Sequence, residues 1–284
     1  MNLLFTVNMQ AIEQLNWCLH SILRFENDYD IYIAHSELTG KAEENLKCSF
    51  MHGRVSLHFI KIDNNFFNGF PESNRYPKEI YYRLRAADFL PDYLDRVLYL
   101  DVDTLVLKPL DELYYMDFED NYFIACTHIK KVLAKFNELR LGLDKGAAYI
   151  NTGVLLMNLE LLRNYNVKEQ VQEIAKTKTL FLPDQDIISI LYGNHIKLID
   201  FQIYNLSDRM VLLNNWQGGN ETINEAWIRE HTVILHFCGK NKPWKKTYNG
   251  LLGKFFYEFQ EQQNTCLLYT SIPTNISTKS GRNC

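Results

Sequence analysis

Two aspartates at the end of a predicted strand are the first candidates for chemistry in this sequence. The segment 97–106 reads VLYLDVDTLV, so Asp101 and Asp103 directly follow an apolar run. Residues i and i+2 of an extended chain point to the same side, so both carboxylates can bind one hard divalent cation. About one such pair is expected by chance in a chain of this kind. Two others occur, at Asp28/Asp30 and Asp184/Asp186. The middle pair is favoured because it ends a predicted buried strand.

A second polar group follows another apolar run near the C-terminal end of the chain. His236 could add an imidazole ligand, and such a mixed set suits Mn²⁺ as well as Mg²⁺. Gly239 allows close approach of the backbone to a ligand, and Lys240 and Lys242 offer positive charge for phosphate. Taken singly, a histidine after a strand is usually structural, and lysines near a turn are usually solvated. Together with the aspartates, these residues predict a site for a metal-bound pyrophosphate.

Two further polar segments interrupt apolar patterns. Asn151, Thr152 and Gly153 lie within the otherwise apolar run 148–158, where glycine often marks a bulge or the close approach of a ligand. Asp184 and Gln185 follow Pro183 at the start of a predicted helix. Their spacing favours a helix cap, and a role in binding hydroxyl groups is compatible with it.

Two segments each allow two interpretations. The segment 81–85 contains Arg83 and Arg85 on a helix that leads to the aspartate strand, and an arginine there could bind a phosphate or sugar through its forked guanidinium, or pair with Asp88 on the surface. The segment 205–227 contains Trp216 and could be an acceptor-side loop or an ordinary connection.

Alternating strand and helix patterns predict an α/β fold with a single, mostly parallel sheet flanked by helices. Ligands of such sheets bind beyond the carboxyl ends of the strands, where the polar groups above lie. Strands are expected at 3–7, 30–35, 55–62, 96–100, 122–127, 148–157, 195–200 and 232–237, and helices at 12–23, 41–50, 80–90, 167–176 and 186–192. Since no repeat or Gly/Ser/Pro-rich linker is present, residues 1–262 are predicted to form one domain. Residues 263–284 are expected to form a polar tail, disordered or non-native.

Composition excludes several classes of protein. With 46% hydrophobic and 23% charged residues, the 284-residue chain is typical of a globular protein rather than a disordered one. A net charge of −4 gives no basic field for a nucleic-acid partner. No apolar run is long enough for a transmembrane segment, no signal peptide is recognisable, and the six cysteines form no CxxC pair. We therefore expect a cytoplasmic protein, with peripheral contact at the inner membrane surface left open. The oligomeric state cannot be derived from the sequence.

The polar segments, taken in their order along the chain, resemble the motifs of the retaining glycosyltransferases of family eight. This family includes bacterial lipopolysaccharide galactosyltransferases and glycogenin. The matching segments are DVD (101–103), NTGVLLMN (151–158), DQDI (184–187) and HFCGKNKPW (236–244). Residues 3–10 and 81–83 also align, so the resemblance covers about residues 1–250. Four motifs in one order argue against coincidence.

The resemblance implies a GT-A fold and a UDP-galactose or UDP-glucose donor, with a glycan, lipid-linked glycan or glycoprotein as acceptor. It implies a Mn²⁺, or alternatively a Mg²⁺, bound by Asp101, Asp103 and His236. The other residues of the implied nucleotide-sugar site are Thr6, Val7 and Asn8 at the nucleoside, Gly239 and Lys242 at the phosphates, and Arg83, Asn151, Thr152, Asp184 and Gln185 around the donor sugar. Val102, between the two aspartates, also belongs to the implied nucleotide-sugar site. Asp184 and Gln185 would be the catalytic pair, with Gln185 opposite the leaving group. In relatives the position of Thr152 is commonly Ala.

The expected mechanism follows from the neutral side chain of Gln185. Retention by double displacement needs a nucleophilic carboxylate, so same-face attack by the acceptor hydroxyl is favoured. One rival is a haloacid-dehalogenase-like phosphatase, whose signature is also a strand ending in DxD. That family has Thr or Val four residues after the first Asp, where this chain has Leu105. A non-catalytic nucleotide-sugar-binding protein is the other alternative, against which the intact Asp101, Asp103 and His236 argue.

Overall fold

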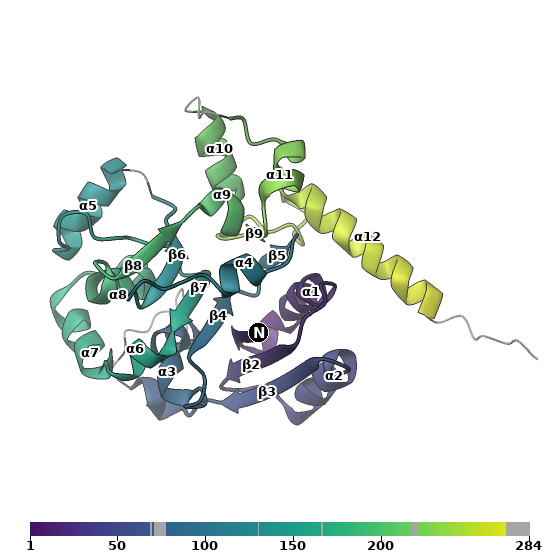
Figure 1. The fold of residues 1–284 in the computed structure, drawn as a ribbon, viewed down its shortest axis with the longest axis horizontal. Helices are drawn as coiled ribbons and strands as arrows, with labels where there is room; N and C mark the ends of the chain where they lie inside the picture. Colours follow the sequence, from purple (N-terminus) through teal and green to yellow (C-terminus); the bar gives the residue numbers. More distant parts are fainter. Residues whose placement is uncertain (69, 71–77, 130, 166, 217–220, 271–284) are drawn as a thin grey trace, which may run out of the picture. The chain divides into compact units, whose positions relative to one another are not determined.

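A computed structural model describes residues 1–68, 70, 78–129, 131–165, 167–216 and 221–270 (Figure 1). The chain forms two compact units, Met1–Cys238 and Gly239–Cys284. No helix in the described part of the chain is long and apolar enough to cross a membrane.

The first unit is built on a seven-stranded sheet with the order β3-β2-β1-β4-β7-β6-β8. These strands are β1 (Asn2–Val7), β2 (Tyr29–His35), β3 (Val55–Lys61), β4 (Arg96–Leu100), β6 (Phe123–Cys126), β7 (Val154–Asn158) and β8 (Ile196–Ile199). Only β7 runs antiparallel to its neighbours β4 and β6. The prediction of an α/β fold with one mostly parallel sheet is therefore confirmed. A separate two-stranded ribbon pairs β5 (Thr104–Val106) with β9 (Ile234–His236).

Helices cover both faces of the sheet. Successive residues of each strand point to opposite sides, and apolar side chains on both sides are buried under helices. In β1, Leu4 packs into one apolar cluster while Leu3 and Phe5 pack into the other. The first cluster includes residues of η3 (Lys78–Arg85), α3 (Ala86–Phe89), α6 (Leu159–Arg163), α7 (Val167–Thr177) and α8 (Pro183–Tyr192). The second includes residues of α1 (Ile12–Leu23), α2 (Gly40–Phe50), α4 (Asp111–Tyr114) and α9 (Phe201–Tyr204).

Local sequence explains where several of these helices begin and which face they bury. Leu15, Leu19 and Ile22 recur at helical spacing in α1 and are fully buried. Thr39 caps α2 by accepting a hydrogen bond from the backbone N–H of Ala42. Asn158 caps α6 in the same way. The remaining elements of the first unit are η1 (Met9–Ala11), η2 (Asn64–Phe67), α5 (Lys131–Leu141), α10 (Asp208–Trp216) and α11 (Glu225–His231).

Some predicted elements differ in length or type. The strand expected at 148–157 begins only at Val154, and the one expected at 232–237 keeps three residues, Ile234–His236. The helix expected at 80–90 is the 3-10 helix η3 followed by α3, which ends two residues before Pro91. The segment 205–227 contains α10 and the first residues of α11.

The second unit contains α12 (Gly253–Thr270). Residues 263–270, which the sequence assigned to a polar tail, are therefore helical. The physical reason is that Lys254–Thr270 contains neither Gly nor Pro, the residues that interrupt helices. The rest of the predicted tail, 271–284, lies outside the described residues. The domain extent of 1–262 stays a prediction.

Candidate functional site

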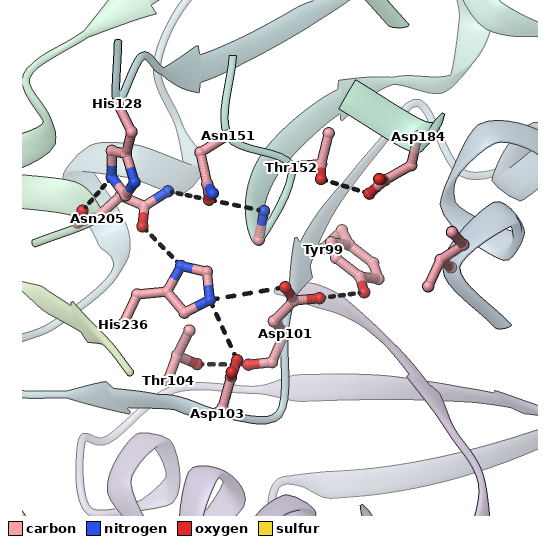
Figure 2. Close-up of polar contacts among 12 residues, drawn as sticks. Tyr99, Asp101, Asp103, Thr104, His128, Asn151, Thr152, Asp184, Asn205 and His236 are labelled. Atoms are coloured by element: carbon pink, nitrogen blue, oxygen red, sulfur yellow. Dashed lines mark hydrogen bonds and ion pairs between the residues drawn. The ribbon is translucent and has the colours of Figure 1, made fainter. Parts of the chain in front are cut away.

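Asp101, Asp103 and His236 lie together, and each presents one ligand atom within 4.8 Å of the others. His236 Nε2 lies 3.1 Å from Asp103 Oδ1 and 3.6 Å from Asp101 Oδ2. Figure 2 shows both carboxylates turned toward the same edge of the imidazole. No other cluster of this composition is found among the described residues. The preference for the middle Asp-x-Asp pair is thus supported by geometry.

Strand pairing places these three side chains. Asp101 follows β4 and its backbone N–H donates to the carbonyl of Gly153, 2.8 Å away, just before β7 begins. The ribbon then pairs Thr104 with His236, and the N–H of Phe237 donates to the carbonyl of Asp103 at 2.9 Å. The ribbon therefore carries a histidine from more than a hundred residues away to the end of β4.

The orientation of His236 leaves its Nε2 as an acceptor. Its Nδ1 lies 2.9 Å from the side-chain oxygen of Asn205, so in the neutral imidazole the proton sits on Nδ1. Nε2 then turns a lone pair toward the oxygens of Asp101 and Asp103. Three acceptor atoms facing one another are unfavourable unless a proton or a metal cation lies between them. The two carboxylates and the imidazole therefore fit a divalent metal such as Mn²⁺ or Mg²⁺.

Gly153 is required by the close approach of three segments. A Cβ at this position would lie 2.8 Å from Asp101 Oδ2 and 2.9 Å from His236 Nδ1, and closer still to Cε1 of the same ring. The glycine in the Asn-Thr-Gly segment thus makes room for the side chains of Asp101 and His236, whereas the close approach of a donor molecule stays a prediction.

Arg83 supplies the positive charge beside the cluster. Its guanidinium lies 3.0 Å from Asp101 Oδ1 and 3.6 Å from Asp184 Oδ2, and it donates to the carbonyl of Thr152 at 2.8 Å. Burial opposes this charge, but the two carboxylates outweigh burial and raise the pKa of Arg83 above its ordinary value. The alternative role, a surface pair with Asp88, belongs to Arg85 instead.

Tyr99 connects β1 to the cluster. Its hydroxyl donates to Asp101 Oδ1 at 2.6 Å and lies 3.2 Å from Thr6 Oγ1. The guanidinium carbon of Arg83 lies 4.4 Å from the centre of the Tyr99 ring. Burial raises the pKa of Tyr99 well above its ordinary value, so the phenol stays a neutral donor. Thr6, predicted at the nucleoside, is thus linked to the proposed metal ligand Asp101 through the hydroxyl of Tyr99.

Asp184 lies inside the first turn of α8 rather than at its cap, which is Leu182. The hydroxyl of Thr152 donates to Asp184 Oδ2 at 2.6 Å (Figure 2). Burial raises the pKa of Asp184, while Arg83 and Thr152 act in the opposite direction. Gln185 follows on α8 and is half-buried, with no side-chain hydrogen bond among the described residues.

Asp186 has a structural role separate from this cluster. Its fully buried carboxylate pairs with Arg140 at 2.7 Å, and Tyr149 donates to it at 2.8 Å. The backbone N–H groups of Phe181 and Leu182 also donate to it, at 2.7 and 3.3 Å. Asp186 is therefore the acid that serves the start of α8, because its carboxylate accepts hydrogen bonds from backbone N–H groups that precede this helix.

The remaining predicted site residues fall into two groups. In the first unit, Val7 is buried at the end of β1 and Asn8 caps η1. Val102 packs against the second apolar cluster, the one that includes residues of α1. Gly239 and Lys242 belong to the second unit, where Gly239 has a φ of +87° and Lys242 lies 5.5 Å from the centre of the Trp244 ring. Their assignment to phosphates stays a prediction.

Two side chains of this site were missed from the sequence. Tyr99 precedes Asp101 by two residues, so strand periodicity places it on the same face and could have identified it. Asn205 gave no such signal, because its partners Asn151 and His236 lie far away in the chain.

The chain is similar in sequence to members of one enzyme family. Residues 2–248 match the family described as glycosyl transferase family 8. The chain is 29% identical to a lipopolysaccharide 1,2-glucosyltransferase of Escherichia coli over 81% of this chain and 68% of that one. It is 26% identical to a lipopolysaccharide 1,3-galactosyltransferase of Salmonella typhimurium over 64% of this chain and 54% of that one.

The solved structure of galactosyltransferase LgtC in complex with donor and acceptor sugar analogs is similar in fold. It superimposes with a TM-score of 0.75 at 22% identity, covering 92% of this chain and 96% of that chain. This likeness confirms the expected GT-A fold. The family match supports the glycosyltransferase and argues against the haloacid-dehalogenase-like phosphatase. The chain belongs to glycosyltransferase family 8.

Proposed function

We propose that this glycosyltransferase moves galactose or glucose, with retention, from a UDP-sugar to a glycan, a lipid-linked glycan or a glycoprotein. The observation that carries the proposal is the convergence of Asp101, Asp103 and His236 at the end of β4, beside the cation of Arg83. The relatives named as lipopolysaccharide glucosyl- and galactosyltransferases support a hexose donor and a cell-surface glycan product. The proposed location is the cytoplasm or the inner membrane surface.

The proposed cofactor is Mn²⁺, with Mg²⁺ as the alternative, held by the two carboxylates and Nε2 of His236. When bound, it would supply positive charge to the diphosphate of the leaving UDP. Arg83 holds Asp101 from the opposite side, with 3.0 Å between guanidinium and carboxylate, and so fixes the orientation of that ligand. The chain's net charge of −4 is no obstacle, because these cations are local.

The donor would extend from the end of β1 to the start of α8. Thr6, Val7 and Asn8 are proposed at the nucleoside, and Gly239 and Lys242 at the phosphates. The residues proposed around the sugar are Arg83, Asn151, Thr152, Asp184 and Gln185, and Val102 is proposed as a further residue of the nucleotide-sugar site. The side-chain oxygen of Asn151 accepts from Gly153 and Asn205. Its amide nitrogen has no hydrogen-bond partner among the described residues and is proposed to donate to a sugar hydroxyl.

The environment of Asp184 supports same-face attack by the acceptor hydroxyl. Arg83 and Thr152 both contact Asp184 Oδ2, and a carboxylate held in this way is a poor nucleophile. Gln185 is an amide and cannot form a glycosyl ester. The leaving phosphate oxygen would take the proton of the acceptor hydroxyl. Mass-spectrometric trapping with a fluorinated donor is expected to show no glycosyl-enzyme, and a covalent adduct on Asp184 would overturn this mechanism.

The donor is tested by hydrolysis of a panel of nucleotide sugars that varies base and sugar separately, with Mn²⁺, with Mg²⁺ and with chelator. UDP-galactose or UDP-glucose is expected to be hydrolysed fastest, and only with a divalent metal. Turnover of a purine-nucleotide sugar in preference to every UDP-sugar would refute the donor assignment. Tight UDP-sugar binding with no turnover, with water or with any glycan acceptor, would instead support a non-catalytic binding protein.

A further inference from the structure

We propose that Asn205 is a positioning residue for the metal site, which fixes His236 as the Nδ1–H tautomer and aims its Nε2 at Asp101 and Asp103. This inference rests on the metal site proposed above. It concerns a residue that is not itself a proposed metal ligand and that lies in the segment between α9 and α10.

A chain of hydrogen bonds with a fixed direction carries the inference (Figure 2). It begins at the backbone N–H of Gly153, which can only donate, and which lies 3.1 Å from the side-chain oxygen of Asn151. That oxygen also accepts from Nδ2 of Asn205 at 3.0 Å. The amide of Asn205 therefore has one possible orientation, with its nitrogen toward Asn151 and its oxygen toward His236.

The orientation of Asn205 then decides the tautomer of His236. The amide oxygen can only accept, so Nδ1, which lies 2.9 Å away, must donate. In the neutral ring the lone pair is left on Nε2, which faces Asp103 at 3.1 Å. A ligating histidine needs this arrangement, because the nitrogen that binds the metal must carry no proton, while the other nitrogen keeps its proton and donates a hydrogen bond to a partner.

The backbone of Asn205 is held as firmly as its side chain. Its carbonyl lies 2.7 Å from Nε2 of His128, which must donate because a carbonyl only accepts. Its N–H donates to the carbonyl of Phe201 at 3.1 Å. Asn205 is fully buried, so no water competes for these groups. An amide immobilised on both sides is suited to hold a ligand in place before the metal binds.

Two substitutions separate positioning from simple support of the fold. Asn205→Leu has a similar size and offers no acceptor to His236, whereas Asn205→Asp retains an acceptor oxygen at that position. Asn158→Leu is the matched control, because it removes an asparagine that caps α6 at the other end of β7. Mn²⁺ affinity is measured by electron paramagnetic resonance of free Mn²⁺, without nucleotide sugar, on protein shown to be folded by circular dichroism.

We expect Asn205→Leu to weaken Mn²⁺ binding by about 10–100-fold, the range for lost outer-shell partners of metal ligands. Asn205→Asp should restore most of that loss, and Asn158→Leu should bind Mn²⁺ as the wild type does. Folded Asn205→Leu with wild-type affinity would overturn the proposal. So would equal losses in Asn205→Leu and Asn205→Asp.

A second readout needs no metal. Nitrogen-15 NMR of the neutral His236 ring in the metal-free protein is expected to show the proton on Nδ1 in the wild type and a changed tautomer in Asn205→Leu. A proton on Nε2 in the wild type would refute the role of Asn205 by itself. A wild type that binds no Mn²⁺ but has the Nδ1–H tautomer would refute the metal site and leave the role of Asn205 in fixing the ring intact.

Discussion

Replacing Gly153 by alanine is expected to weaken metal binding without any change of charge or of backbone conformation. The φ of Gly153 lies outside the left-handed region, so an alanine can adopt the same backbone. The effect must then come from the added methyl group, which would meet Asp101 and His236 directly.

The size of the effect follows from distances. The methyl carbon would lie 2.8 Å from Asp101 Oδ2 and 2.9 Å from His236 Nδ1, whereas ordinary contact begins at 3.4 Å. Both groups would therefore have to retreat by roughly 0.5 Å or more, and metal–ligand distances tolerate only about 0.2 Å. Overpacking of this kind costs about 1–3 kcal/mol of stability. We expect Mn²⁺ affinity to fall at least about 10-fold, comparable to the loss of a supporting partner.

The assay is Mn²⁺ titration by isothermal calorimetry, together with urea unfolding of each protein. Gly40→Ala is the control, since a Cβ there has no neighbour within 4 Å at the start of α2. That substitution should leave Mn²⁺ affinity unchanged and stabilise the protein by about 0.4–1 kcal/mol. Wild-type Mn²⁺ affinity in Gly153→Ala would refute the assignment of Asp101 and His236 as ligands in the observed arrangement.

Two further predictions concern stability. Burial lowers the pKa of His128 from 6.5 to about 4. Between pH 6.5 and pH 4 the unfolded chain therefore binds more protons than the folded chain, and the free energy of unfolding falls as the pH falls. His128→Gln should remove this pH-dependent loss of unfolding free energy, which amounts to at most about 3 kcal/mol. The measurement is urea unfolding from pH 4 to 7, and an unchanged dependence of the unfolding free energy on pH would contradict the prediction. Arg140→Met leaves the buried carboxylate of Asp186 without its cation and should cost about 3 kcal/mol. Arg229→Met, which breaks an exposed pair with Glu225, should cost less than about 1 kcal/mol in the same thermal or urea unfolding assay. Equal losses in the two variants would contradict the buried pairing.

Local pattern was sufficient for the parts of the site that lie on strands. Asp101 and Asp103 could be paired from the sequence because strand periodicity is local and because an apolar run precedes them. His236 could be placed at a strand end for the same reason. That it meets the aspartates depends on the β5–β9 ribbon, a long-range pairing that the sequence pattern did not reveal.

The partners of buried polar groups could not be predicted. The spacing of Asp184 and Asp186 indicated a helix terminus, but the two carboxylates bind different cations, Arg83 and Arg140. Asn205 lies in a segment without periodicity, and its importance comes only from contacts that the fold brings together. Local patterns indicate which face is buried, whereas the pairing of buried polar groups is a property of the whole packing.

The most direct test of the proposed function is the Mn²⁺-dependent hydrolysis of UDP-galactose and UDP-glucose by the wild type and by Asp101→Asn. This substitution keeps the size of the side chain and an acceptor for Tyr99, but removes the charge beside His236. We predict metal-dependent turnover in the wild type and a loss of at least about 100-fold in the variant, the order expected when charge stabilisation of the leaving group is removed. Equal Mn²⁺-dependent turnover by the two proteins would contradict the assignment of Asp101 to the metal.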